Sequence, residues 1–196
     1  MAGSRNDDDA ITNAALAAKA GDRASATAFV QMTQRQVYRF LAHLCDPNEV
    51  EDLTQETYLR AMSSLKRFAA RSSARTWLLG IARRVAADQV RRNTRSPRTT
   101  SLYAREAQGN LHKHASGFED EALLRRLLDA LSPQRRDAFV ATQVIGLSYA
   151  EAAAVCDCPV GTIRSRVARA REDLVSALDH DQGGRDNALR SNPRSS

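Results

Sequence analysis

The chain has 196 residues, enough for one domain of ordinary size or for two small ones. Apolar residues make up 42% of the sequence and aromatic residues only 5%, a composition that favours helices built around Ala, Leu and Val over β-sheet. No apolar run is long enough for a bilayer span, and the first residues are polar and acidic, so we expect neither a transmembrane helix nor a signal peptide. Three cysteines do not make a disulfide scaffold, and we expect a cytoplasmic protein.

The net charge of +6 is concentrated in one segment. Residues 71–98 contain eight arginines and a single acid, Asp88, so this segment carries +7 and the remainder of the chain −1. A segment this basic indicates a polyanionic partner.

Helical spacing dominates the first half of the chain. Residues 11–44 predict one or two helices with a break near Gly21, and residues 49–66 predict the next. A longer helix is expected from about Ala74 to Arg92. Its predicted buried positions are Trp77, Leu78, Ile81, Val85 and Val90.

An acidic stretch occupies residues 46–59, which hold five acids and no base. Asp52, Gln55 and Glu56 stand at positions i, i+3 and i+4, so they share one helix face. Such a face would repel phosphate and could contact a basic protein. From the residues alone a solvated face, with acids that favour the helix dipole, is the preferred interpretation. A metal site that uses Glu49, Asp52 and Glu56 lacks the Glu-x-x-His motif of di-metal carboxylate proteins.

Trp77 lies among the arginines of the +7 segment. An aromatic residue between cations suits single-stranded or melted nucleic acid, where bases stack and phosphates are neutralised. Its neighbours Leu78, Leu79 and Ile81 instead favour a core position for Trp77. The arginines remain candidates for nucleic-acid binding.

Residues 93–117 predict a linker, because they are rich in turn-forming residues and poor in apolar ones. An amphipathic helix follows from Phe118, and Ser132-Pro133 predicts the start of another that ends at Gly146. The polar tail from residue 179 is expected to be disordered. The predicted fold class is all-α, with two small helical domains joined by a flexible linker.

A helix-turn-helix is predicted near the C-terminus. Ser148 and Glu151 form a capping box that opens a short helix, which cannot continue through Pro159. The second helix begins there and has no acid in residues 159–171. A short capped helix, a tight turn and a basic second helix are typical of a helix-turn-helix that binds the DNA major groove. The alternative is a solvated basic face, although solvated helices usually mix both charges.

Three motifs resemble one family in the order in which that family has them. Residues 52–57 (DLTQET) resemble region 2.2 of bacterial sigma factors, and residues 68–84 resemble regions 2.3 and 2.4. Residues 146–149 (GLSY) and 159–166 (PVGTIRSR) resemble region 4.2. Without the large regions 1.1 and 3, the chain is similar to the extracytoplasmic-function (group 4) sigma factors, and among them to the actinobacterial sigma-C type. The resemblance covers about residues 10–178.

The resemblance implies a transcription initiation factor that binds core RNA polymerase and directs it to promoters. The polymerase does the chemistry, so the resemblance implies no enzyme, no cofactor and no metal. It assigns residues 8–92 to region 2, 93–117 to a region 3.2-like linker towards the active-site channel, 118–178 to region 4 and 179–196 to a tail. Family members are often bound by an anti-sigma factor.

The resemblance also implies the role of single residues. Asp52, Gln55 and Glu56 match the face that grips the clamp helices of the β′ subunit, while region 4 meets the β flap. The residues expected to melt and bind the −10 strand are Ser72, Ser73, Arg75, Arg83, Arg84, Asp88, Arg91 and Arg92. The residues expected at the double-stranded −35 element are Pro159, Val160, Gly161, Thr162, Arg164, Ser165, Arg166 and Arg169.

One residue departs from the family pattern. Many members carry Asn after Ile-Ala-Arg, where this chain has Arg84, a change that bears on the preferred −10 base. Cys156 and Cys158 lie in the predicted turn, but Cys45 is distant and no His is near, so we expect no zinc site. His112 and His114 in the linker are weak metal candidates.

Two other functions are compatible with parts of the sequence. A stand-alone helix-turn-helix regulator with an N-terminal dimerisation or sensing domain would bind a palindromic site by itself. That interpretation leaves the +7 segment unexplained. A metal-dependent enzyme would show turnover as the isolated protein.

Overall fold

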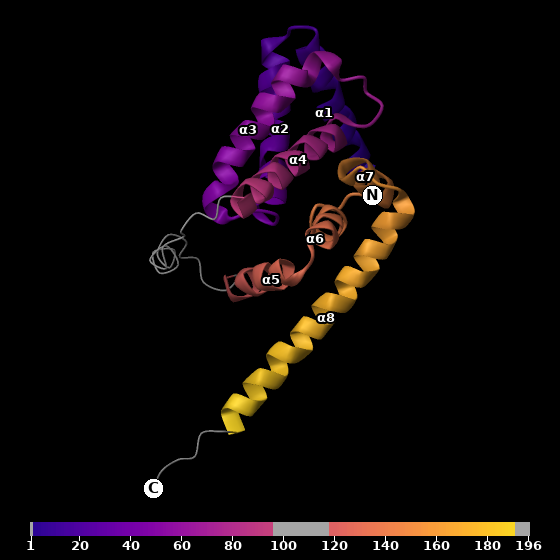
Figure 1. Ribbon diagram of the computed structural model, residues 1–196. Coiled ribbons are helices and arrows are strands. Elements are labelled where there is room, and N and C mark those ends of the chain that lie inside the picture. Colours follow the sequence, from indigo (N-terminus) through magenta and orange to yellow (C-terminus); the bar gives the residue numbers. More distant parts are fainter. Residues whose placement is uncertain (1, 96–117, 191–196) are drawn as a thin grey trace.

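The computed structural model describes residues 2–95 and 118–190, and every regular element in these ranges is a helix (Figure 1). The first domain consists of α1 (Ala2–Lys19), α2 (Arg23–Ala42), η1 (Pro47–Glu49), α3 (Val50–Ser64), η2 (Leu65–Arg67) and α4 (Ala74–Arg95). The second consists of α5 (Phe118–Ala130), α6 (Pro133–Phe139), η5 (Val140–Val144), α7 (Tyr149–Cys156) and α8 (Val160–Arg190). No helix in the described ranges has the length and apolarity needed to cross a membrane. His112, His114 and most of the expected linker lie outside the described residues.

The break expected near Gly21 separates α1 from α2. Gly21 has a φ of +104°, which glycine adopts without the steric penalty of a side chain. The next residue, Asp22, caps α2 by accepting a hydrogen bond from the Ala24 backbone N–H at 2.9 Å. The chain therefore reverses within a few residues and lays α1 along α2.

The first domain packs around large side chains from α2 and α4. Phe29, Phe40, Leu78 and Leu79 are each at most 1% exposed. Trp77 is partly buried and packs against Phe68 with ring centroids 4.9 Å apart, so the core position favoured for it is confirmed.

Two predictions for the helices of this domain need correction. Val90 was expected to be buried but is 44% exposed, because it lines a cavity where the two domains meet rather than the core of the first domain. The helix α4 also continues to Arg95, three residues past the expected boundary.

The second domain contains the predicted helix-turn-helix. Ser148 and Glu151 form the expected capping box, and Asp157 ends α7 in the left-handed conformation with a φ of +52°. Ile163 and Val167 of α8 are buried against the domain core. The helix α8 runs to Arg190 and projects from the body in Figure 1, so residues 179–190 continue this helix where disorder was expected. Residues 191–196 lie outside the described part.

The two domains pack against each other along α4, a contact that the sequence did not predict. A β-carbon added to Gly80 of α4 would lie 4.0 Å from the Cα atom of Val155 in α7, so the two helices approach closely. Arg83 of α4 donates a 2.7 Å hydrogen bond to the carboxylate of Asp137 in α6. The guanidinium of Arg125 in α5 donates to the carbonyl of Ala42 at the end of α2.

Replacement of the N-cap of α7 tests the local stability of the helix-turn-helix. Ser148→Ala removes the side chain that accepts from the Glu151 backbone N–H, so the free energy of unfolding should fall by about 1 kcal/mol. Chemical denaturation measures this change. Ser165→Ala, the same substitution on the exposed side of α8, should change the free energy of unfolding by less than about 0.5 kcal/mol. Equal effects of the two variants would contradict the capping role.

Candidate functional site

The acidic face of α3 is open to solvent. Asp52 and Gln55 are exposed, and Glu56 is partly exposed beside them. Leu53 and Thr57, on the opposite side of the helix, are buried in the domain core and fix the direction of this face. The three side chains that the sequence grouped together therefore lie on one accessible surface.

Sequence reasoning missed Leu59 on the same face. This leucine stands seven residues after Asp52, two helical turns along, and is 67% exposed, the largest exposure among the described large apolar residues. An apolar side chain beside carboxylates is typical of a protein–protein contact that combines charge with apolar burial. The sequence alone could have placed Leu59 on this face, because position 59 continues the i, i+3, i+4, i+7 series that begins at Asp52.

Arg60 connects the acidic face with α4. Its Nε donates to Glu56 at 2.7 Å and one of its terminal nitrogens donates to Asp88 at 2.8 Å. Asp88 also accepts from Arg91 at 2.6 Å. Hydrogen bonds from Arg60 and Arg91 lower the pKa of Asp88, which is thus held as a carboxylate between two cations. Asp88 organises charge on α4 rather than presenting a lone negative charge to a polyanion.

The loop before α4 places the two predicted serines at the start of this helix. Ser72 and Ser73 are partly buried. Ser73 accepts a hydrogen bond from the Thr76 backbone N–H at 3.2 Å and so satisfies a donor of the first helical turn. Ala70 has a φ of +50°, which turns the chain sharply ahead of the helix.

The arginines of α4 divide into two groups. Arg84, Arg91 and Arg92 are exposed. The side chains of Arg75 and Arg83 are only 11% and 21% exposed, because both lie at the contact between the domains. Arg75 donates to the carbonyl of Ile145 at 3.2 Å, and Arg83 donates to Asp137. In this arrangement the second group is engaged within the protein.

The second basic surface lies on α8. Most of the predicted residues are exposed there, while Thr162 and Arg166 are partly buried. Arg166 lies near the turn, with a terminal nitrogen 3.6 Å from the Cys158 sulfur. The exposed members of the predicted set are Pro159, Val160, Gly161, Arg164, Ser165 and Arg169. The start of the helix is thus free to enter a groove.

Cys45 and Cys156 provide no reactive centre. All three cysteines are free, and burial raises the pKa of the Cys45 and Cys156 thiols to about 12. Both are therefore protonated thiols at neutral pH, whereas a metal ligand or a nucleophile must be a thiolate. Among the described residues no three His, Cys, Asp or Glu side chains are grouped as a metal site.

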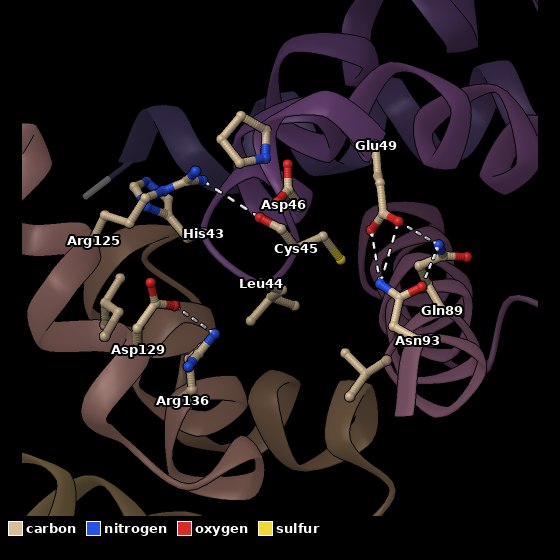
Figure 2. Close-up of a pocket in the computed structure, with 13 residues that line it drawn as sticks. His43, Leu44, Cys45, Asp46, Glu49, Gln89, Asn93, Arg125, Asp129 and Arg136 are labelled. Atoms are coloured by element: carbon tan, nitrogen blue, oxygen red, sulfur yellow. Dashed lines mark hydrogen bonds and ion pairs between the residues drawn. The ribbon is translucent and has the colours of Figure 1, made fainter. Parts of the chain in front are cut away.

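Glu49, a candidate ligand of the metal-site hypothesis, has a structural role. It accepts hydrogen bonds from Gln89 at 2.6 Å and from Asn93 at 3.2 Å, so it ties η1 to the end of α4. Figure 2 shows these bonds on one side of a cavity of about 380 Å³ where the two domains meet. On the other side Asp129 pairs with Arg136 at 3.0 Å. Glu49 and Asp129 are thus engaged within the protein, whereas the buried Nε of Arg136 has no hydrogen-bond partner among the described residues.

Comparisons with known proteins cover both domains. Residues 29–96 match the family Sigma-70 region 2, and residues 121–174 match the family Sigma-70, region 4. The chain is 49% identical to the ECF RNA polymerase sigma factor SigC of Mycobacterium tuberculosis over 181 residues, 92% of this chain and 98% of that protein.

Two solved structures have a similar fold. CnrH, solved in complex with the cytosolic domain of CnrY, has a TM-score of 0.70 and 24% identity over 88% of this chain and 99% of that one. The sigma factor RpoE of Bartonella quintana, solved with the anti-sigma factor NepR, has a TM-score of 0.63 and 29% identity over 76% of this chain and 94% of that one.

The enclosed pair between Arg83 and Asp137 should hold the domains together in the free chain. Asp137→Ala leaves the Arg83 guanidinium without its carboxylate, a loss of about 1–3 kcal/mol at the domain contact. We predict a larger radius of gyration for this variant in small-angle X-ray scattering. Asp129→Ala is the matched control, since its partner Arg136 belongs to the same domain. An unchanged radius, or the same increase in both variants, would contradict the role of the pair.

Proposed function

The chain belongs to the extracytoplasmic-function group of the sigma-70 family of RNA polymerase sigma factors, and we propose that three separate surfaces of its two domains carry out promoter recognition. As a member of this family it binds core RNA polymerase and directs it to promoters. We assign region 2 to residues 8–92 and region 4 to residues 118–178. The observation that carries the proposal is the segregation of charge, with an open acidic face on α3 and basic surfaces on α4 and α8.

The α3 face is proposed to bind the clamp helices of the β′ subunit. Asp52, Gln55 and Glu56 offer two carboxylates and an amide to a basic partner, and Leu59 offers apolar area next to them. Phosphate would be repelled by this face, which excludes DNA as its partner. Burial of Leu59 supplies the apolar part of the contact, while the carboxylates set its orientation.

The start and the exposed side of α4 are proposed to bind the melted −10 strand. Ser72 and Ser73 provide hydroxyl groups in the loop where a flipped base would lie, and Arg84, Arg91 and Arg92 neutralise the backbone along the helix. Extrusion of a base costs a few kcal/mol, which contacts in the pocket and to phosphates must offset. Asp88 acts in this set by orienting Arg91.

Arg75 and Arg83 join this surface only after the domains part. Both donate to groups of the second domain, Ile145 and Asp137, in the free chain. Engagement of the two domains at separate sites on the polymerase and on promoter elements would break these contacts and release both guanidinium groups. The closed arrangement thus keeps two −10 residues from DNA until the polymerase is bound.

The start of α8 is proposed to bind the −35 element in the major groove. Its exposed residues begin at Pro159, where a helix-turn-helix presents side chains to base edges. Arg164 and Arg169 extend this cationic surface along the helix. The β flap is the proposed polymerase contact of the same domain.

An anti-sigma factor is a further proposed partner. Two proteins of similar fold were solved in complexes, one with the cytosolic domain of CnrY and one with the anti-sigma factor NepR. An inhibitor that covers the α3 face would compete directly with the polymerase.

A stand-alone helix-turn-helix regulator is not favoured. Such a regulator would need only α7 and α8, and it would leave the open α3 face and the basic side of α4 without a role. Run-off transcription with purified core polymerase distinguishes the two functions. We expect promoter-specific transcripts only when the chain and core are both present. Palindrome binding by the chain alone, without initiation, would support the regulator instead.

Charge reversal on α3 tests the polymerase contact. Asp52→Arg should weaken binding to core polymerase at least about tenfold, because a cation replaces a carboxylate that faces a basic partner. Surface plasmon resonance with immobilised core measures this affinity. Asp9→Arg is the matched control: it changes the charge equally at an exposed acid of the same domain, but it lies on α1 rather than on α3. Similar losses in both variants would show a general charge effect rather than a specific face.

Truncation of an arginine on α8 tests the −35 contact. Arg166→Ala should weaken holoenzyme binding to the promoter by about 1–3 kcal/mol. The loss is confined to one base pair where the guanidinium contacts a base edge, and is uniform across sequences where it contacts phosphate. Electrophoretic mobility shifts with a set of promoter DNAs that differ at the −35 element distinguish a base-edge contact from a phosphate contact. Arg126→Ala, at an exposed position of α5, should leave binding unchanged. If Arg166→Ala also has no effect, Arg166 is not part of the interface.

A further inference from the structure

We propose that α1 positions the −10-binding start of α4, with Asp8 and Thr12 as the positioning residues. Both lie before residue 29, where the match to the region 2 family begins. The proposal rests on the proposed function of α4, and it deepens that function by explaining how the loop and the first arginine of the helix are held. The partner that this device serves is a melted DNA strand.

Thr12 caps α4 from a position 62 residues earlier in the chain. Its hydroxyl accepts a 3.1 Å hydrogen bond from the Ala74 backbone N–H and donates a 2.7 Å bond to the Asp8 carbonyl. Ala74 is completely buried, so its N–H would otherwise lack a partner of its own helix at the first position. The start of α4 is therefore tied to α1.

The other end of the loop is held by the same helix. Lys19, at the end of α1, donates a 2.7 Å hydrogen bond from its ammonium group to the carbonyl of Phe68. Residues 68–74 are thus attached to α1 at both ends. Between these attachments Arg71 is exposed and Ser72 is partly exposed, where they can meet a strand.

Asp8 fixes the direction of the Arg75 side chain. Arg75 donates from Nε to the Gln36 side-chain oxygen at 2.8 Å and from one terminal nitrogen to Asp8 at 3.4 Å. Its other terminal nitrogen donates to the Ile145 carbonyl of the second domain at 3.2 Å. The Asp8 and Arg75 side chains are only 17% and 11% exposed, so solvent screens this ion pair weakly.

The three acceptors of Arg75 differ in which domain supplies them. Asp8 and Gln36 belong to the first domain and remain when the domains part, while Ile145 is lost. One terminal nitrogen then loses its acceptor, and the planar guanidinium stays oriented by the other two. Arg75 is thus preorganised to donate to a phosphate or a base edge without an entropic cost at the moment of binding.

A double-mutant cycle on holoenzyme separates this role from simple packing. We measure promoter melting by permanganate reactivity of thymines near −10, and core affinity in parallel. Asp8→Asn removes the charge but keeps the size, and it should reduce melting about tenfold while core affinity stays unchanged. Asp8→Glu, which keeps the charge, should restore most of the promoter melting. Asp9→Asn, the same change at an exposed neighbour, should behave as the wild type.

The cycle is completed with Arg75→Ala. In this background Asp8→Asn should have no further effect on melting, because Asp8 acts through the arginine. The positioning role would be overturned if the losses of melting in the two single variants were additive in the double variant. It would also be overturned if Asp8→Asn melted the promoter as well as the wild type, or if Asp8→Asn lost core affinity in parallel with melting. Failure of the wild-type holoenzyme to melt any promoter would instead overturn the proposed function itself.

Discussion

Two surfaces of opposite charge must coexist on one small domain, and the packing of α3 against α4 meets this constraint. The carboxylates of α3 and the guanidinium groups of α4 would neutralise one another if they lay on the same side. Arg60 and Asp88 occupy the boundary, where Arg60 pairs with Glu56 on one side and with Asp88 on the other. These pairs are partly exposed, and each contributes about 0–1 kcal/mol. Their importance lies in where they place charge rather than in stability.

The contact between the domains is proposed to add a second level of control. The helix α4, which is proposed to bind the −10 strand, also packs against α7. Its Arg75 and Arg83 donate hydrogen bonds to groups of the second domain. In the proposed function, a free chain in this arrangement has a cost to overcome before it binds DNA, and differential binding by the polymerase would overcome it. Core binding and DNA binding would be coupled in this way, although their proposed surfaces are separate.

Local features of the fold could be predicted from the sequence, whereas contacts between distant segments could not. The core stripe of α8 and the capping box at Ser148 follow from spacings of three and four residues. The α3 face followed from the same rule, which also extends to Leu59. The pair between Arg83 and Asp137 joins residues 54 positions apart, and no periodicity marks it.

The same limit explains what the sequence left out of the site. Arginines were assigned to DNA from their charge and from the family resemblance, neither of which distinguishes exposed Arg84 from enclosed Arg75. The attachment of Thr12 to Ala74 spans 62 residues and concerns one hydroxyl group. Family resemblance supplied the roles of the surfaces, and the structure supplies the contacts through which single residues could perform them.

Hydroxyl-radical footprinting with mass spectrometry tests the central claim, the division of labour between α3 and the DNA-binding helices, most directly. Leu59 on α3 and Val160 at the start of α8 are both exposed apolar side chains that report protection. We predict that core polymerase alone protects Leu59, and that Val160 becomes protected only when promoter DNA is added. Unchanged reactivity of Leu59 in the holoenzyme, or its protection by DNA without polymerase, would contradict the claim.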